Sequence, residues 1–181
     1  MKTIKNLTDK NIVLLLRQHS FDKAFDLIVE QYHQKLYWHI RRIVLSHDDA
    51  NDVLQNTFMK IWKALPKFRG DSKVYTWLFR IATNESITFI NKKKKHLSFD
   101  DVSGEIPSPH QLGIDFTASE IEQKLEMAIA SLPEKQRVVF NLRYYEEMKY
   151  SDISEVTGTS VGGLKANYHI AVKKIEDYLT S

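Results

Sequence analysis

The sequence predicts an all-α protein of two small helical domains joined by a flexible linker, and three observations support this fold class. Only six Gly and four Pro occur in 181 residues, which is few for a chain of strands and tight turns. Apolar residues recur every three or four positions in both halves, the spacing of one helical face. Residues 96–117 break this pattern and contain two Gly and two Pro. We therefore expect domains over residues 1–95 and 118–181, with an acidic linker over 96–117.

Three helices are predicted in the N-terminal half. A stripe of apolar residues from Phe21 to Leu45 indicates one long amphipathic helix. A second helix can be capped by Ser46, Asp48 or Asp49, and the acids suit the positive end of its dipole. Pro66 ends that helix, because proline excludes the preceding residue from helical geometry. After the basic loop of residues 67–73, a third helix is expected from Val74 to about Asn91.

The C-terminal half is predicted to resume as helix at about Ala118, with a break at Pro133. Its last two helices, over about 151–157 and 160–179, are separated by a turn at Gly158. This spacing is typical of a helix-turn-helix over residues 150–170, in which glycine takes a positive φ and Ser160 caps the second helix. An ordinary helical hairpin is the alternative interpretation. Small, amide and basic residues face outward on the last helix and are suited to a DNA major groove: Gly162, Gly163, Lys165, Asn167, His169 and Lys173.

Charge is distributed unevenly along the chain. Residues 1–95 carry 18 Lys and Arg against 9 Asp and Glu, residues 96–118 carry four acids and no Lys or Arg, and residues 119–181 carry 8 bases and 10 acids. The basic half suits a polyanionic partner. The chain has no Cys, which excludes disulfides and thiolate metal sites, and its most apolar early run, from Ile12 to Leu16, is too short to span a bilayer. We expect a soluble, cytoplasmic protein that is not embedded in a membrane.

No pattern for catalysis is found. The sequence lacks a phosphate-binding glycine loop, an HExxH pair and a GxSxG elbow. The acids after His47 are better explained by helix capping than by metal binding. His33 and His39 are six residues apart on one helix, so we expect surface or interface histidines and not a ligand pair. We therefore expect no catalytic residue, no metal, no cofactor and no small-molecule substrate.

The loop of residues 67–73 and the helix after it combine cations with aromatic and amide groups. Cations bind phosphates, aromatic rings stack on unpaired bases and Asn reads base edges, so this combination favours strand-separated DNA. A core helix with a solvated lysine tail is the alternative, and the two interpretations can describe two faces of one helix. Trp77 and Leu78 are expected in the core. The candidates for the DNA side are Tyr75, Phe79, Arg80, Asn84 and the lysines from Lys92 to Lys95.

These segments resemble the extracytoplasmic-function (ECF) group of bacterial RNA polymerase sigma factors, in the minimal form with only the second and fourth sigma domains. The resemblance rests on DANDVLQNTFMKIWKAL followed by FRGDSKVYTWLFRIATNE, and on LPEKQRVVFNLRYYEEMKYSDISEVTGTSVGGLKANYHIAVKKI. It extends along the chain from about Phe21, in the order of the family. Asn56 departs from the family pattern because many relatives have an acid there.

The resemblance implies three functional sets of residues. The clamp set would dock on the β′ clamp of the polymerase, the −10 set would read and melt the −10 element, and the −35 set would bind the −35 element. The clamp set is Asp52, Gln55 and Asn56; the −10 set is Phe68, Arg69, Asp71, Ser72, Lys73, Tyr75, Arg80, Asn84, Lys92 and Lys93; the −35 set is Ser160, Gly162, Gly163, Lys165, Asn167, His169 and Lys173.

The resemblance also implies partners: core RNA polymerase, bound through its β′ clamp and β flap, promoter DNA, and an anti-sigma factor. The expected function is therefore that of a sigma factor, which is not an enzyme. The alternative is a free-standing dimeric helix-turn-helix regulator with an N-terminal sensing domain, which would not need an exposed clamp set. An enzyme acting on nucleic acid would need more carboxylates on the basic face than Asp71 and Glu85.

Overall fold

The computed structural model describes residues 2–97 and 120–180, and helices are the only regular elements in these ranges, which confirms the all-α prediction. The N-terminal unit holds α1 (Lys2–Arg17), α2 (Phe21–Val44), α3 (His47–Ala64), the short 3-10 helix η1 (Leu65–Lys67) and α4 (Val74–Leu97). The C-terminal unit holds α5 (Glu120–Ala130), α6 (Glu134–Tyr144), α7 (Tyr150–Thr157) and α8 (Val161–Thr180). Apart from the last two residues of α4, the predicted linker over 96–117 lies outside the described residues, as does the predicted domain start at residue 118.

The helix boundaries follow local sequence signals. Leu45 ends α2 in the left-handed conformation with φ 69°, and its N–H bonds to Arg41 O. The Ser46 hydroxyl accepts a hydrogen bond from Asp49 N at 3.4 Å and caps α3, so Ser46 is the cap among the three predicted candidates. Helix α1 was not predicted from the sequence. It is held by Ile12 and Leu16, which lie one turn apart and are both buried.

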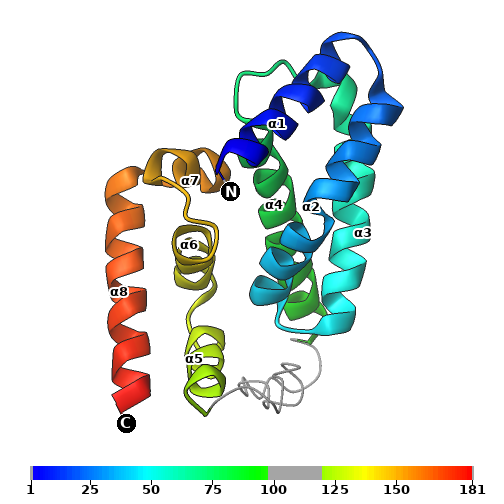
Figure 1. The fold of residues 1–181 in the computed structure, drawn as a ribbon. Helices are drawn as coiled ribbons and strands as arrows, with labels where there is room; N and C mark the ends of the chain where they lie inside the picture. The colour runs from blue at the N-terminus through cyan, green and yellow to red at the C-terminus, as the bar shows by residue number, and fades with distance from the viewer. Residues whose placement is uncertain (1, 98–119, 181) are drawn as a thin grey trace.

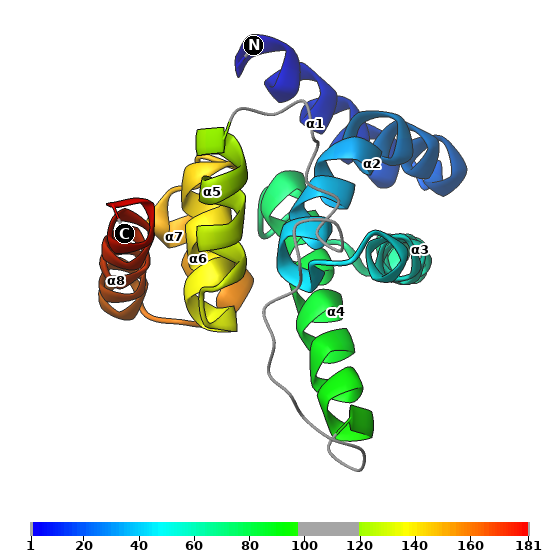
Figure 2. The same cartoon turned by 90° about the horizontal axis from the view of Figure 1, so that it is seen from below.

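Helix α2 is the centre of the N-terminal unit. It packs against α1, α3 and α4, and its other side faces α6 (Figures 1 and 2). Its buried stripe repeats every three or four residues, as the sequence predicts. The stripe consists of Ala24, Ile28, Tyr32, Leu36, Ile40 and Ile43. None of the described helices is long and apolar enough to cross a membrane.

The two units share one buried cluster. Six apolar residues of α6, α7 and the loop between them join the N-terminal core: Val138, Val139, Leu142, Met148, Ile153 and Val156. Helix α7 lies beside α4, and α6 lies beside α2. Helix α8 covers the far side of α5 and α6, so α8 and α3 stand on opposite sides of the molecule (Figures 1 and 2). A flexible tether between independent domains, as inferred from the sequence, gave no reason to expect this contact.

Candidate nucleic-acid interface

The loop before α4 is anchored by the ring of Phe68. Phe68 is partly buried and packs against Trp77, with the ring centroids 4.8 Å apart. Gly70 has φ 80°, a left-handed conformation that glycine adopts without strain. Arg69 and Asp71 are exposed beside it. The loop therefore presents a cation and an acid to solvent on a fixed base.

The first turns of α4 place most aromatic groups inside the fold. Phe79 is 0% exposed and packs against Tyr75 and His39, with centroids 4.3 Å and 4.8 Å away, so the prediction that it faces DNA is wrong. Tyr75 is also buried, and its hydroxyl donates to Glu146 Oε2 at 2.5 Å. Burial and the nearby Glu146 raise the pKa of Tyr75. Asn84 lies exposed on the same helix, and Arg80 is half-buried.

His39 joins α2 to α4 through a buried hydrogen bond. Its Nε2 lies 2.8 Å from Thr83 Oγ1, and the imidazole is fully buried. Burial, aided by the charge of Arg42, lowers the pKa of His39 to about 3, so the ring is neutral at physiological pH. The expectation of a surface or interface histidine is therefore wrong for His39, which belongs to the core.

The lysines at the end of α4 are solvent-exposed, and two of them pair with acids on other helices. Lys93 Nζ lies 2.6 Å from Asp49 Oδ2 near the start of α3, and Lys94 Nζ lies 3.7 Å from Glu134 at the start of α6. Ion pairs of this exposed kind contribute little to stability. Because the pairs are weak, the lysines remain suited to binding phosphate.

The clamp set lies on the solvent face of α3. Asp52, Gln55 and Asn56 are all exposed, whereas Val53 and Ile61 on the other face are buried. Asp52 and Gln55 are one turn apart and project from the same side of the helix. Helix α3 stands at the edge of the molecule, where a large partner can reach it (Figure 1).

The C-terminal helices have helix-turn-helix geometry. Gly158 has φ 68°, and the Ser154 hydroxyl donates to Thr159 O at 2.8 Å across the turn. The Ser160 hydroxyl accepts from Gly163 N at 3.2 Å, which confirms the predicted cap of α8. A Cβ placed on Gly162 would meet no atom within 4 Å, so this backbone is open to a partner. The remaining −35 residues also lie on the surface, with Lys165, His169 and Lys173 exposed and Asn167 half-buried.

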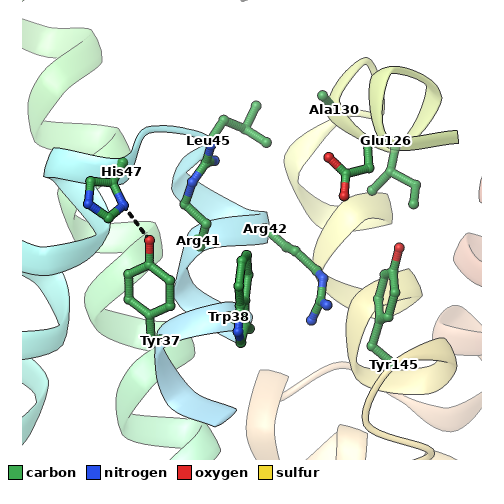
Figure 3. A pocket seen from close by; sticks show the side chains of 10 residues that line it. Tyr37, Trp38, Arg41, Arg42, Leu45, His47, Glu126, Ala130 and Tyr145 are labelled. Atoms are coloured by element: carbon green, nitrogen blue, oxygen red, sulfur yellow. Dashed lines mark hydrogen bonds between the residues drawn. The ribbon is translucent and has the colours of Figure 1, made fainter. Parts of the chain in front are cut away.

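A pocket of about 470 Å³ lies between α2 and the start of the C-terminal unit (Figure 3). The guanidinium of Arg42 lies 3.7 Å from the ring centroid of Tyr145 and 5.9 Å from that of Trp38. Sequence reasoning missed this site, although Trp38 and Arg42 are one turn apart on the polar side of α2 and could have been paired. The lining residues are Tyr37, Trp38, Arg41, Arg42, Leu45, His47, Glu126, Ile129, Ala130 and Tyr145. Among the residues that the structure describes, no cluster of three or more His, Asp or Glu could hold a metal ion.

Two family models match the chain. Sigma-70 region 2 matches residues 28–96, and Sigma-70, region 4 matches residues 122–175. The chain is 30% identical to the ECF RNA polymerase sigma-E factor of Haemophilus influenzae, over 96% of each chain. It is 33% identical to the RNA polymerase sigma-H factor of Pseudomonas aeruginosa, over 90% of this chain and 89% of that one.

Solved structures show the same fold. The sigma factor RpoE of Bartonella quintana, crystallised with the anti-sigma factor NepR, has a TM-score of 0.73 and 22% identity, covering 87% of this chain and 98% of that one. CnrH, in complex with the cytosolic domain of CnrY, has a TM-score of 0.69 and 21% identity, covering 96% and 97%. The chain belongs to the ECF sigma factors of bacterial RNA polymerase, a non-enzymatic class that binds core polymerase for the initiation of transcription. Most of the N-terminal half, residues 28–96, is therefore sigma region 2.

Proposed function

We propose that residues 1–95 bind the polymerase clamp and melt the −10 element, and that residues 118–181 bind the −35 element. The observation that carries this assignment is the exposed backbone and polar face of α8, where Gly162, Lys165 and His169 stand clear of the fold. A helix with small and polar residues at its N-terminal end suits the major groove. The basic loop and Asn84 support a second contact, to the separated −10 strand.

We propose the exposed face of α3 as the contact with the β′ clamp. Replacing Asp52 and Gln55 together by Ala should weaken binding to core polymerase by about tenfold, because a few residues carry most of the binding energy of an interface. Both side chains are exposed, so the fold should be unchanged. Affinity is measured by fluorescence anisotropy with labelled sigma factor, and Lys23→Ala on the exposed side of α2 is the control. Equal affinity of the double variant and the control would contradict the clamp assignment.

We propose an anti-sigma factor as a further partner. Two structural relatives support this, because each was crystallised with such a protein or with the cytosolic domain of its partner. Co-purification of the tagged chain from its own cells, followed by mass spectrometry, tests the proposal. Recovery of core polymerase subunits alone would contradict it.

Run-off transcription with core polymerase tests the proposed promoter roles. The template is a promoter whose transcript rises when the chain is overexpressed, and the −10 and −35 elements are altered separately. Loss of the transcript with either alteration supports the proposal. A transcript that is insensitive to both alterations would refute it.

A further inference from the structure

The pocket between α2 and the C-terminal unit belongs to none of the three functional sets. Its volume of about 470 Å³ is in the range of small-ligand sites in proteins, roughly 300–1,000 Å³. Trp38 lines the pocket from α2 and is 48% exposed. Figure 3 shows the side chain of Arg42 between Trp38 and Tyr145. An indole that is this open to water can stack on a further planar ring.

Two guanidinium groups also line this pocket, from adjacent positions of α2. Arg41 is only 8% exposed, and burial lowers its pKa, while Tyr37 and Glu126 act in the opposite direction. The Arg42 guanidinium lies 3.7 Å from the ring centroid of Tyr145. Glu126 is the only acid among the described lining residues, so the two arginines leave an excess of positive charge. A guanidinium binds a carboxylate or a phosphate through paired N–H donors, and the pocket therefore favours an anion.

The other lining groups are apolar or hold the rim of the pocket. Leu45 comes from the end of α2, and Ile129 and Ala130 come from the end of α5, so both units supply apolar contacts. The Tyr37 hydroxyl lies 2.5 Å from His47 Nδ1, and this hydrogen bond joins α2 to the start of α3 (Figure 3). Mostly apolar and aromatic walls with a few charged groups are typical of small-molecule sites. A DNA surface instead follows the nucleic-acid backbone with a row of cations.

We propose that this pocket is a binding site for a small organic anion with a planar ring. The ring stacks on the exposed indole of Trp38, and the anionic group, a phosphate or a carboxylate, binds Arg41 and Arg42. An inorganic anion uses only the arginines and a neutral ring uses only the indole, so neither binds as tightly as a ligand that has both groups. The proposal is independent of the promoter roles, because these three residues belong to none of the functional sets.

Calorimetric titration of the full chain, without polymerase or DNA, tests the site with two probes. GMP carries a phosphate and phenylacetate a carboxylate, so the two probes distinguish the anionic group. At least one of them should bind, and its neutral counterpart, guanosine or phenylacetamide, should bind about tenfold more weakly, as should inorganic phosphate. Trp38→Ala and Arg42→Gln should each weaken binding of that probe by about tenfold. Trp38→Phe keeps a ring for stacking and should bind within about threefold of the unaltered protein.

Two matched substitutions outside the pocket serve as controls. Trp62→Ala on α3, where the residue is 42% exposed, and Arg69→Gln in the exposed loop before α4 should leave the affinity for the probe unchanged. Circular dichroism verifies that each variant is folded. The proposal is overturned if neither probe binds at millimolar concentration, or if binding is insensitive to Trp38→Ala and Arg42→Gln. A loss with Arg69→Gln but not with Arg42→Gln would also overturn it, because the probe would then occupy the proposed DNA surface.

Discussion

Two basic surfaces are proposed to bind DNA: the loop before α4 with the first turns of α4, and helix α8. They differ in how much of each surface is covered by the rest of the fold. On α4, Tyr75 and Phe79 are buried, and Lys73 is paired with Asp152 of the other unit. On α8, Lys165 and His169 are exposed. Two surfaces of similar composition can therefore differ in how accessible they are to DNA. The surface proposed for melted DNA makes contacts inside the fold, whereas the surface proposed for duplex DNA is exposed.

The largest expected effect tests how deeply α4 is built into the core. Phe79→Ala should lower the free energy of unfolding by about 3–5 kcal/mol, because it leaves a cavity beside the rings of Tyr75 and His39. Ile170→Ala on α8, where the side chain is 42% exposed, should change it by no more than about 0.5 kcal/mol. Urea denaturation measures both. Similar losses for the two variants would remove the contrast between the helices.

The second effect concerns pH and separates the buried His39, which joins α2 to α4, from the exposed surface of α8. The pKa of His39 is about 3 in the folded protein and near 6.5 in the unfolded chain, so only the unfolded chain binds a proton between these values. The contribution of neutral His39 to the free energy of unfolding is therefore fully present above about pH 6.5. It falls as the pH drops, by about 2 kcal/mol between pH 7 and pH 5. Urea titrations at several pH values should show this slope.

The control for the pH effect compares two histidines. His39→Gln should flatten the dependence below pH 6.5, even if the variant is less stable at every pH. His169→Gln should leave the slope unchanged, because His169 is exposed on α8. A slope that survives His39→Gln would assign the effect to another group.

The third effect is on duplex binding by α8. Lys165→Ala should weaken binding of the free protein to −35 duplex by about fivefold and reduce the salt dependence by roughly one phosphate contact. The affinity for −10 single strand should not change, because Lys165 is on the other unit from the −10 set. Anisotropy with the two probes at several salt concentrations measures this. Equal losses on both probes would show that the −35 surface is misplaced.

The smallest effect compares two neighbouring glycines of α8. Gly162→Ala should raise the free energy of unfolding by up to about 1 kcal/mol, since the new methyl group meets no atom within 4 Å. Gly163→Ala should gain less, because its Cβ would lie 3.3 Å from Ser160 Oγ and from Thr159 Cγ2. Urea denaturation of both variants, with −35 duplex binding measured in parallel, checks this. A Gly162→Ala variant that is more stable and binds duplex equally well would rule out close backbone contact there.

The sequence was most informative where a local signal determines structure. The predicted caps at Ser46 and Ser160 and the turn at Gly158 are confirmed because each depends on the conformation of a few consecutive residues. Phe79 was assigned to the wrong face for a different reason. A helix that is covered on two sides carries apolar residues around most of its circumference, so periodicity alone cannot separate rings that pack from rings that could stack on bases.

Contacts between the units could not be predicted from the sequence. The pattern of α6 and α7 indicates that Val138 and Ile153 are buried, but it does not indicate which surface covers them. The same holds for Asp152, which reads as an ordinary acid in the first turn of a helix and proves to be the partner of Lys73. Helix α1 was missed because Ile12 to Leu16 form an unbroken apolar run, in which the spacing of one helical face cannot be recognised.

The hydrogen bonds of Arg137 bear on how readily the two units would pack together after a separation. Its guanidinium donates to Ala130 O and Leu132 O within its own unit, both at 3.0 Å, and to Ile43 O at the end of α2. Separation of the units would break only the last bond, and the other two would still hold the guanidinium within its own unit. The chain then avoids most of the roughly 2 kcal/mol of side-chain entropy that ordering a free arginine would cost. Re-docking of the units thus begins from a side chain that already has its bound conformation.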